Sequence, residues 1–327
     1  MEPPPPRPTR LGRLWVYLQE QFPPAVMVPA GVASFLAMYF GLQALAGRAE
    51  LQLSWRAALA AATVVGFMLL LRTYDELKDV EADLELGRAG DPRYKDRAIV
   101  TGQVRVDDVR ALRWWTTAAL VAFNLPLGAA SLGAFAGLFL LGWLSFKWFF
   151  WPAVQRNLLL AFATHNPLSL AVEGYVLVVY GSELGWEGLG PEAALLLVGL
   201  WFPVAAWETS RKIRLPEQET SYQTYSMLLG WRAATALPLT FVAVSTACLA
   251  LFARHTGLSA VYVAVLLLAA AAAVGACALL LVAPTPARTK LKPFVEAFSV
   301  AAQVGLVIAL VAGRDVVFAG GGLPWSP

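Results

Sequence analysis

The sequence predicts an all-α integral membrane protein in which about nine transmembrane helices form a bundle around a central cavity. Of its 327 residues, 58% are hydrophobic and only 14% are charged, whereas about a quarter of the residues of a soluble protein are charged. The apolar residues form long runs, each close to the roughly 20 residues that cross a bilayer. The basic residues gather between alternate runs, as the positive-inside rule requires. In water such a chain would expose large apolar patches.

The first 22 residues are predicted to form a tail outside the bilayer core. The tail begins with a proline-rich stretch, Pro3 to Pro6. The following segment, residues 10–22, has the pattern of a short amphipathic helix on the membrane surface, with Arg10 and Arg13 near the lipid headgroups. Residues 23–327 are then predicted to be a single transmembrane domain.

Nine apolar runs in that domain are candidates for membrane spans. The third and the fourth are separated only by a short turn around Leu127 and Gly128. The predicted spans cover residues 23–47, 55–74, 112–128, 129–147, 157–181, 190–209, 231–253, 258–283 and 294–313.

The distribution of charge predicts a multi-pass protein of the cell membrane with its N-terminus in the cytoplasm. In that orientation nearly all of the 25 Lys and Arg residues lie in the tail or beside the loops after the second, fourth, sixth and eighth spans. The exceptions are Arg48, Arg56, Arg254 and Arg314. Because the basic residues follow this topology rule, they give no support to nucleic-acid binding. The long hydrophilic loop, residues 75–111, is then cytoplasmic.

An acidic stripe continues from the cytoplasmic end of the second span, in the sequence LLLRTYDELKDVEADLEL. If the helix continues at 100° per residue, one stripe carries Arg72, Asp75, Glu76, Asp79 and Asp83. Carboxylates crowded beside a membrane span repel one another, and a hard cation such as Mg²⁺ relieves that repulsion. The alternative is a solvated helix end stabilised by charge pairs four residues apart.

A second charged cluster ends the sixth span. Glu208, Arg211 and Lys212 share one helical face, and Pro216 breaks the helix shortly afterwards. Both clusters are at cytoplasmic ends and are four spans apart, which indicates two related halves that face a common cavity. A cavity with carboxylates on one wall and Arg and Lys on the other suits a metal-bound diphosphate.

The first cluster resembles a motif of the UbiA superfamily of intramembrane prenyltransferases. The family motif NDxxDxxxD corresponds to DELKDVEAD, with Asp75 in the Asn place, Glu76 in the first Asp place, and Asp79 and Asp83 matching. A following loop stretch, DRAIVTGQV, is similar to the family's RPxPSG-like segment, and Arg97 is one of its matching residues.

The second cluster is a degenerate form of the family's second motif. Glu208 and Lys212 occupy the two acidic places of DxxxD, and the expected LG pair ends the stretch YSMLLG at Gly230. One acid followed by two bases does not favour a second Mg²⁺ site. Arg211 and Lys212 are therefore expected to contact the diphosphate directly, although residues that only obey the positive-inside rule would look the same.

The resemblance implies Mg²⁺-dependent transfer of an isoprenyl group from a prenyl diphosphate to an aromatic or lipid-soluble acceptor. It implies a metal site made of Glu76, Asp79 and Asp83. The other expected sites follow from the motif positions and the basic residues beside them. The catalytic set is Asp75, Glu76, Asp79, Asp83, Glu208 and Lys212, and the residues expected to bind the diphosphate are Arg72, Arg97, Arg211 and Lys212.

The fifth span contains polar residues that are unusual inside a membrane. His165 and Asn166 lie together, and Glu173 follows about two turns later on roughly the same face. They are candidates to bind or deprotonate the acceptor, and hydrogen bonding between neighbouring helices explains them equally well.

Two other protein classes compete with a prenyltransferase. A CDP-alcohol phosphotransferase is also helical and Mg²⁺-dependent, but its DG and AR signature is absent from the sequence. A non-catalytic membrane protein of the same fold, which binds or transports prenyl lipids, stays an alternative because the second motif is degenerate. Such a protein would bind a prenyl diphosphate without consuming it.

Overall fold

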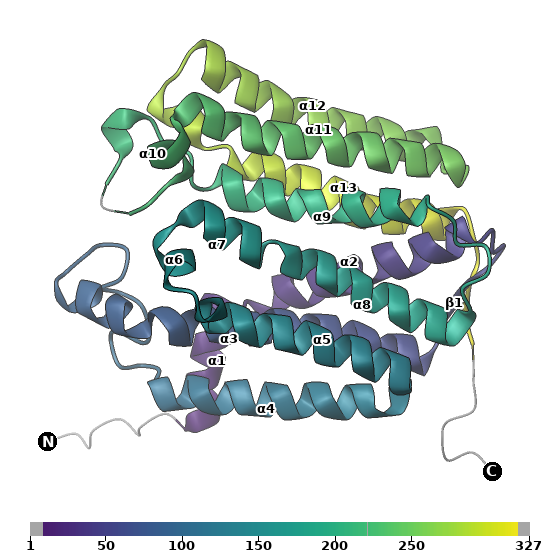
Figure 1. Ribbon diagram of the computed structural model, residues 1–327, viewed down its shortest axis with the longest axis horizontal. Helices are drawn as coiled ribbons and strands as arrows, with labels where there is room; N and C mark the ends of the chain where they lie inside the picture. Colours follow the sequence, from purple (N-terminus) through teal and green to yellow (C-terminus); the bar gives the residue numbers. More distant parts are fainter. Residues whose placement is uncertain (1–8, 221, 320–327) are drawn as a thin grey trace, which may run out of the picture.

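The computed structural model describes residues 9–220 and 222–319 and shows a bundle of long, roughly parallel helices (Figure 1). The predicted all-α membrane fold is confirmed. The first part of the chain forms one half of the bundle, and α9 with the helices after it forms the other. The α-helices are α1 (Arg10–Gln21), α2 (Pro24–Leu45), α3 (Trp55–Arg88), α4 (Val106–Asn124), α5 (Ala129–Phe146), α6 (Pro152–Arg156), α7 (Leu158–His165), α8 (Pro167–Leu184), α9 (Ala193–Ser210), α10 (Tyr225–Leu229), α11 (Trp231–His255), α12 (Ala260–Val282) and α13 (Lys292–Ala312).

Seven helices in the described part of the chain are long and apolar enough to cross a membrane: α2, α3, α5, α9, α11, α12 and α13. The other two predicted spans correspond to α4 and to the pair α7 and α8, which run beside the others in Figure 1. The fifth span is therefore not one helix as predicted. Pro167 has no backbone N–H to continue the hydrogen-bond ladder of α7, so the chain starts a new helix there.

Two helix boundaries differ from the prediction in ways that matter for the site. α3 continues to Arg88, well past the predicted end of the second span, so the whole acidic stripe is helical. At about 1.5 Å per residue its 34 residues are much longer than the hydrocarbon core. α4 begins at Val106 because Asp108 caps the backbone N–H of Arg105.

A short parallel pair of strands, β1 (Leu51–Leu53) and β2 (Val316–Phe318), closes the end of the bundle away from the acidic stripe. The sequence did not predict it. Three residues are too few to show an alternating pattern, and the two strands come from opposite ends of the chain.

The close contact between α9 and α11 depends on one glycine. A side chain at Gly199 would place its Cβ 2.7 Å from Leu249 Cδ2. The hydroxyl of Ser245 on α11 donates to the Gly199 carbonyl at 2.6 Å. Small residues permit such approaches in membrane bundles, so this contact holds α9 and α11 together in the second half of the bundle.

The amphipathic helix α1 crosses the end of α4 instead of running beside it (Figure 1). Leu14 and Tyr17 are buried against α3, α4 and the loop between them, while Leu11 and Trp15 remain exposed. Arg13 Nε donates to Asp108 Oδ2 at 2.6 Å. This geometry is compatible with a helix on the membrane surface, which stays a prediction.

The Arg13–Asp108 pair gives a pH-dependent prediction. Hydrogen bonds from the Arg13 guanidinium lower the pKa of Asp108, which lies before the apolar part of α4, to about 2. Because the folded pKa is depressed, the stabilisation is present above the ordinary carboxyl pKa of about 3.9 and is lost as pH falls toward 2. The difference in melting temperature between the wild type and Asp108→Asn should therefore be constant from about pH 8 to 5 and shrink below about pH 4. A constant difference down to pH 2.5 would contradict this.

Candidate active site

A cavity of about 620 Å³ opens at the end of the bundle that carries both charged clusters. Its mouth is lined by charged residues of α3 and α9, and its interior is lined mainly by apolar side chains of α2, α3 and α8. The hydrophilic segments after α3 and after α9 lie at this same end in Figure 1. The two clusters that are far apart in the sequence therefore face one cavity.

The α3 wall presents two carboxylates, Asp75 and Asp79, which are one helical turn apart and both line the cavity. Lys78 Nζ lies 3.0 Å from Asp75 Oδ1. It also lies 4.1 Å from the centre of the Trp148 ring. Asp79 forms no ion pair with any residue that the structure describes. The cavity wall therefore offers one paired and one unpaired carboxylate.

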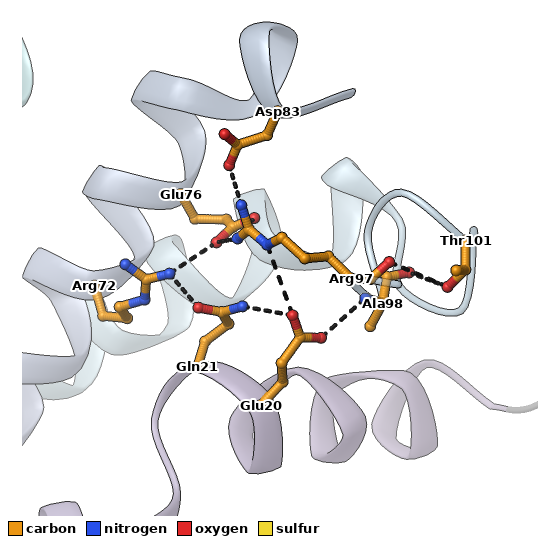
Figure 2. A network of polar contacts seen from close by, with 8 residues as sticks. All are labelled: Glu20, Gln21, Arg72, Glu76, Asp83, Arg97, Ala98 and Thr101. Carbon is orange, nitrogen blue, oxygen red and sulfur yellow. Dashed lines mark hydrogen bonds and ion pairs between the residues drawn. The ribbon is translucent and has the colours of Figure 1, made fainter. Parts of the chain in front are cut away.

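The remaining acidic residues of the stripe turn away from this cavity and are bound by Arg97 (Figure 2). Arg97 Nη2 lies 2.6 Å from Glu76 Oε2, and Arg97 Nη1 pairs with Asp83. The Glu76 side chain is only 1% exposed. Glu20 of α1 joins the network, with its Oε1 3.7 Å from Arg97 Nε and its Oε2 accepting from the Ala98 N–H at 2.9 Å.

Arg72 lies on the boundary between the two groups. It lines the cavity, pairs with Glu76 Oε2 at 3.2 Å, and hydrogen-bonds to Gln21 of α1. This division follows the helix geometry. At 100° per residue, Asp75 and Asp79 are on one side of Arg72, and Glu76 and Asp83 are on the other. The single stripe that the sequence predicts is thus split lengthwise between the cavity and Arg97.

The structure does not bring the three predicted metal ligands together. Of Glu76, Asp79 and Asp83, only Asp79 lines the cavity, and no group of three or more acidic, His or Cys residues in the described chain is arranged to hold a metal. Proteins commonly bind Mg²⁺ with one or two carboxylates plus substrate phosphates. Asp75 and Asp79 fit that requirement, and metal binding by any of these residues stays a prediction.

The α9 wall carries the second cluster at the position that the sequence predicts, but α9 ends at Ser210, so Arg211 and Lys212 lie in the turn after the helix and not on a helical face. Glu208 is held between Arg211, at 2.5 Å from Arg211 Nη2 to Oε2, and Lys212, at 2.8 Å from Lys212 Nζ to Oε1. All three side chains line the cavity. One carboxylate between two cations leaves this wall with a net positive charge, which favours an anion over a second metal ion.

Three aromatic residues of the mouth were not singled out by the sequence. Tyr222 and Tyr225, which lie between α9 and α11 in the sequence, line the cavity. Burial raises the pKa of the Tyr225 hydroxyl, and the nearby Glu208 carboxylate raises it further. Trp148 belongs to a turn of three aromatic residues in the left-handed region, with φ near +50° from Trp148 to Phe150. Strained backbone of this kind is common at functional sites. The sequence contains no pattern that predicts it.

The polar residues of the fifth span all line the cavity. Asn166 Oδ1 accepts a hydrogen bond from Trp201 Nε1 at 2.7 Å. His165 contacts the rings of Trp148 and Phe149, and its Nδ1 lies 2.9 Å from the Ala161 carbonyl oxygen. Each of these two residues contacts a neighbouring side chain or backbone group and also lines the cavity. Both predicted roles, acceptor binding and hydrogen bonding within the bundle, therefore remain open.

Comparison with solved structures identifies the fold. The structure of digeranylgeranylglyceryl phosphate synthase in membranes aligns with a TM-score of 0.63 and 12% identity, over 92% of this chain and 99% of that chain. A UbiA homolog from Aeropyrum pernix K1 aligns with a TM-score of 0.59 and 20% identity, over 88% of this chain and 97% of that one. No family model and no curated protein matches the sequence.

Proposed function

We propose that this chain, which has the fold of a UbiA homolog, transfers an isoprenyl group from a prenyl diphosphate to a lipid-soluble acceptor inside the membrane. One observation carries the proposal. A single cavity has Asp75 and Asp79 on one wall, Arg211 and Lys212 on the other, and an apolar interior below them. Such a cavity matches both parts of a prenyl diphosphate, which has a highly charged head and a hydrocarbon tail.

Mg²⁺ is the cofactor that this donor set suits. Asp75 and Asp79 would hold it together with phosphate oxygens, and it would neutralise charge on the departing diphosphate. Glu76 and Asp83, which the sequence assigned to the metal, would instead act through Arg97. Their proposed role is to hold the extended end of α3 in place, which orients Asp75 and Asp79.

The chain's own residues have distinct parts in the proposed reaction. Arg72, Arg211 and Lys212 would donate charge-assisted hydrogen bonds to the diphosphate oxygens. As the bond between the allylic carbon and oxygen breaks, negative charge grows on the diphosphate, where these cations stabilise it. The allylic cation that remains would face the apolar interior, where water cannot capture it before the acceptor attacks and loses a proton.

The proposed orientation places the cavity mouth and the N-terminus in the cytoplasm, at the cell membrane. Four basic residues of the described chain line the mouth, namely Arg72, Lys78, Arg211 and Lys212. The positive-inside rule assigns that end to the cytoplasm. A water-exposed mouth would admit the charged head, while the hydrocarbon tail would reach the interior from the bilayer.

The proposal is tested by measuring diphosphate release from C10, C15 and C20 prenyl diphosphates. The purified protein would be given a membrane extract as a source of acceptors, with Mg²⁺ or with excess EDTA. Mg²⁺-dependent release supports the proposal, and the labelled product then identifies the acceptor. Tight binding of all three compounds without release would instead support a protein that binds or transports prenyl lipids.

Lys212→Ala tests the direct role of the cationic wall. The substitution removes a cation that would pair with the diphosphate, so it should weaken prenyl diphosphate binding about tenfold. Because Lys212 is not placed to bind a metal, the Mg²⁺ concentration that gives half-maximal diphosphate release should change less than about twofold. Arg214→Ala is a matched control, since Arg214 follows closely on the chain, donates to Thr220 and does not line the cavity. Unchanged prenyl diphosphate binding in Lys212→Ala would show that Lys212 does not contact the diphosphate and is basic only because it lies on the cytoplasmic side.

A further inference from the structure

The middle of the cavity carries polar groups that a hydrocarbon tail cannot use. Ser34 of α2, Glu173 of α8 and Gln303 of α13 all line it, and together they are called the polar floor. Ser34 and Gln303 are each about ten residues from the first residue of their helices, Pro24 and Lys292, which is about 15 Å along the helix axis. That distance is about half of the hydrocarbon core. The floor is therefore well below the charged mouth and near the middle of the membrane.

Glu173 lacks the hydrogen bonds that a buried carboxyl group requires. The residue is 4% exposed. Within residues 9–220 and 222–319, its Oε2 has no hydrogen-bond partner, and its Oε1 has only the Ser34 hydroxyl at 3.5 Å. A carboxyl group left in this state costs several kcal/mol in an apolar environment. The terminal torsion of Glu is soft, so either oxygen can turn toward the cavity.

Another carboxyl group on the same helix shows the difference between a structural and an unsatisfied acid. Glu183 of α8 accepts from the Tyr39 hydroxyl at 2.9 Å and also from the Ser54 hydroxyl. Gln303, in contrast, forms no hydrogen bond with any residue that the structure describes. Glu173 and Gln303 thus both line the cavity with hydrogen-bonding capacity that no described residue satisfies.

We infer that the polar floor binds a hydroxyl group of a lipid-soluble substrate, and that under the proposed function this substrate is the acceptor. A hydroxyl both donates and accepts, so it satisfies Glu173 whether the carboxyl group is ionised or protonated. A second diphosphate does not fit, because the floor has no cation to pair with it. A site built around a hydroxyl rejects analogues that lack it, because its own polar groups then stay unpaired.

The inference is tested with 4-nonylphenol and nonylbenzene, which differ only in the hydroxyl group. Binding would be measured in nanodiscs of fixed lipid composition, with empty nanodiscs giving the background. The wild type and Glu173→Gln should bind the phenol about tenfold more tightly than the hydrocarbon, whereas Glu173→Leu should show less than about twofold preference. Gln303→Leu should lower the preference about threefold. An equal preference in Glu173→Leu, or none in the wild type, would overturn the inference.

Binding of farnesyl diphosphate to the same samples separates this inference from the proposed function. Because its charged head binds at the mouth, Glu173→Leu should still bind it, which also shows that the variant is folded. If no sample binds farnesyl diphosphate or its C10 and C20 counterparts, the proposed function is wrong, and the comparison of phenol with hydrocarbon still decides whether the floor binds a hydroxyl group.

Discussion

Replacing Asp79 with Asn should lower Mg²⁺-dependent diphosphate release by about two orders of magnitude. The substitution removes the one cavity carboxylate of α3 that has no ion pair among the described residues, and it changes almost no volume. The diphosphate would then lose most of the cation that neutralises its growing charge. The measurement is the initial rate of release from the best prenyl diphosphate over a range of Mg²⁺ concentrations.

Glu81→Gln is the matched control for that experiment. Glu81 is on the same stretch of α3 and also carries one negative charge, but it is exposed and does not line the cavity. Its rate should stay within about twofold of the wild type. An equal loss of release rate in the two variants would mean that release depends on the total negative charge of this stretch of α3 and not on a metal site at Asp79. No loss in Asp79→Asn would exclude that residue as a metal ligand.

Replacing Arg97 with Ala should produce the largest loss of stability. Arg97 pairs with Glu76, Asp83 and Glu20, and the Glu76 side chain is 1% exposed (Figure 2). Removing one partner of a buried ion pair leaves an uncompensated charge and costs about 3–5 kcal/mol. For a chain of this size, that corresponds to a fall in melting temperature of roughly 10 °C. Thermal unfolding in one detergent, followed by tryptophan fluorescence, measures it.

Arg93→Ala is the control, because it removes another arginine of the same loop. Arg93 pairs with Asp91 at 2.7 Å, and its side chain is 46% exposed. Exposed pairs contribute about 0–1 kcal/mol, so the melting temperature should change by no more than about 2 °C. A double variant, Arg97→Ala with Glu76→Gln, should recover part of the loss because it removes the unpaired charge. Equal melting temperatures for Arg97→Ala and Arg93→Ala would show that the network does not stabilise the fold.

The acidic stripe on α3 shows which features of the site can be predicted from the sequence and which cannot. Periodicity at 100° per residue correctly groups Arg72 with its four acidic neighbours, because that relation lies within one helix. It does not say which neighbours flank the stripe on its two sides. Arg97 comes from a loop, and Glu20 comes from α1. Only their packing against α3 determines that Glu76 and Asp83 are paired while Asp75 and Asp79 face the cavity.

The features that depend on composition and local spacing could be predicted from the amino-acid sequence. These are the membrane fold, the approximate spans and the pairing of two charged clusters at one end, because hydropathy and charge asymmetry are summed along continuous segments. Features that join residues far apart in the sequence could be seen only in the folded chain. Those are the strand pair between Leu51–Leu53 and Val316–Phe318, the Arg97 network and the polar floor around Glu173. Each depends on which helix faces meet, and that is set by packing between segments that local patterns do not describe.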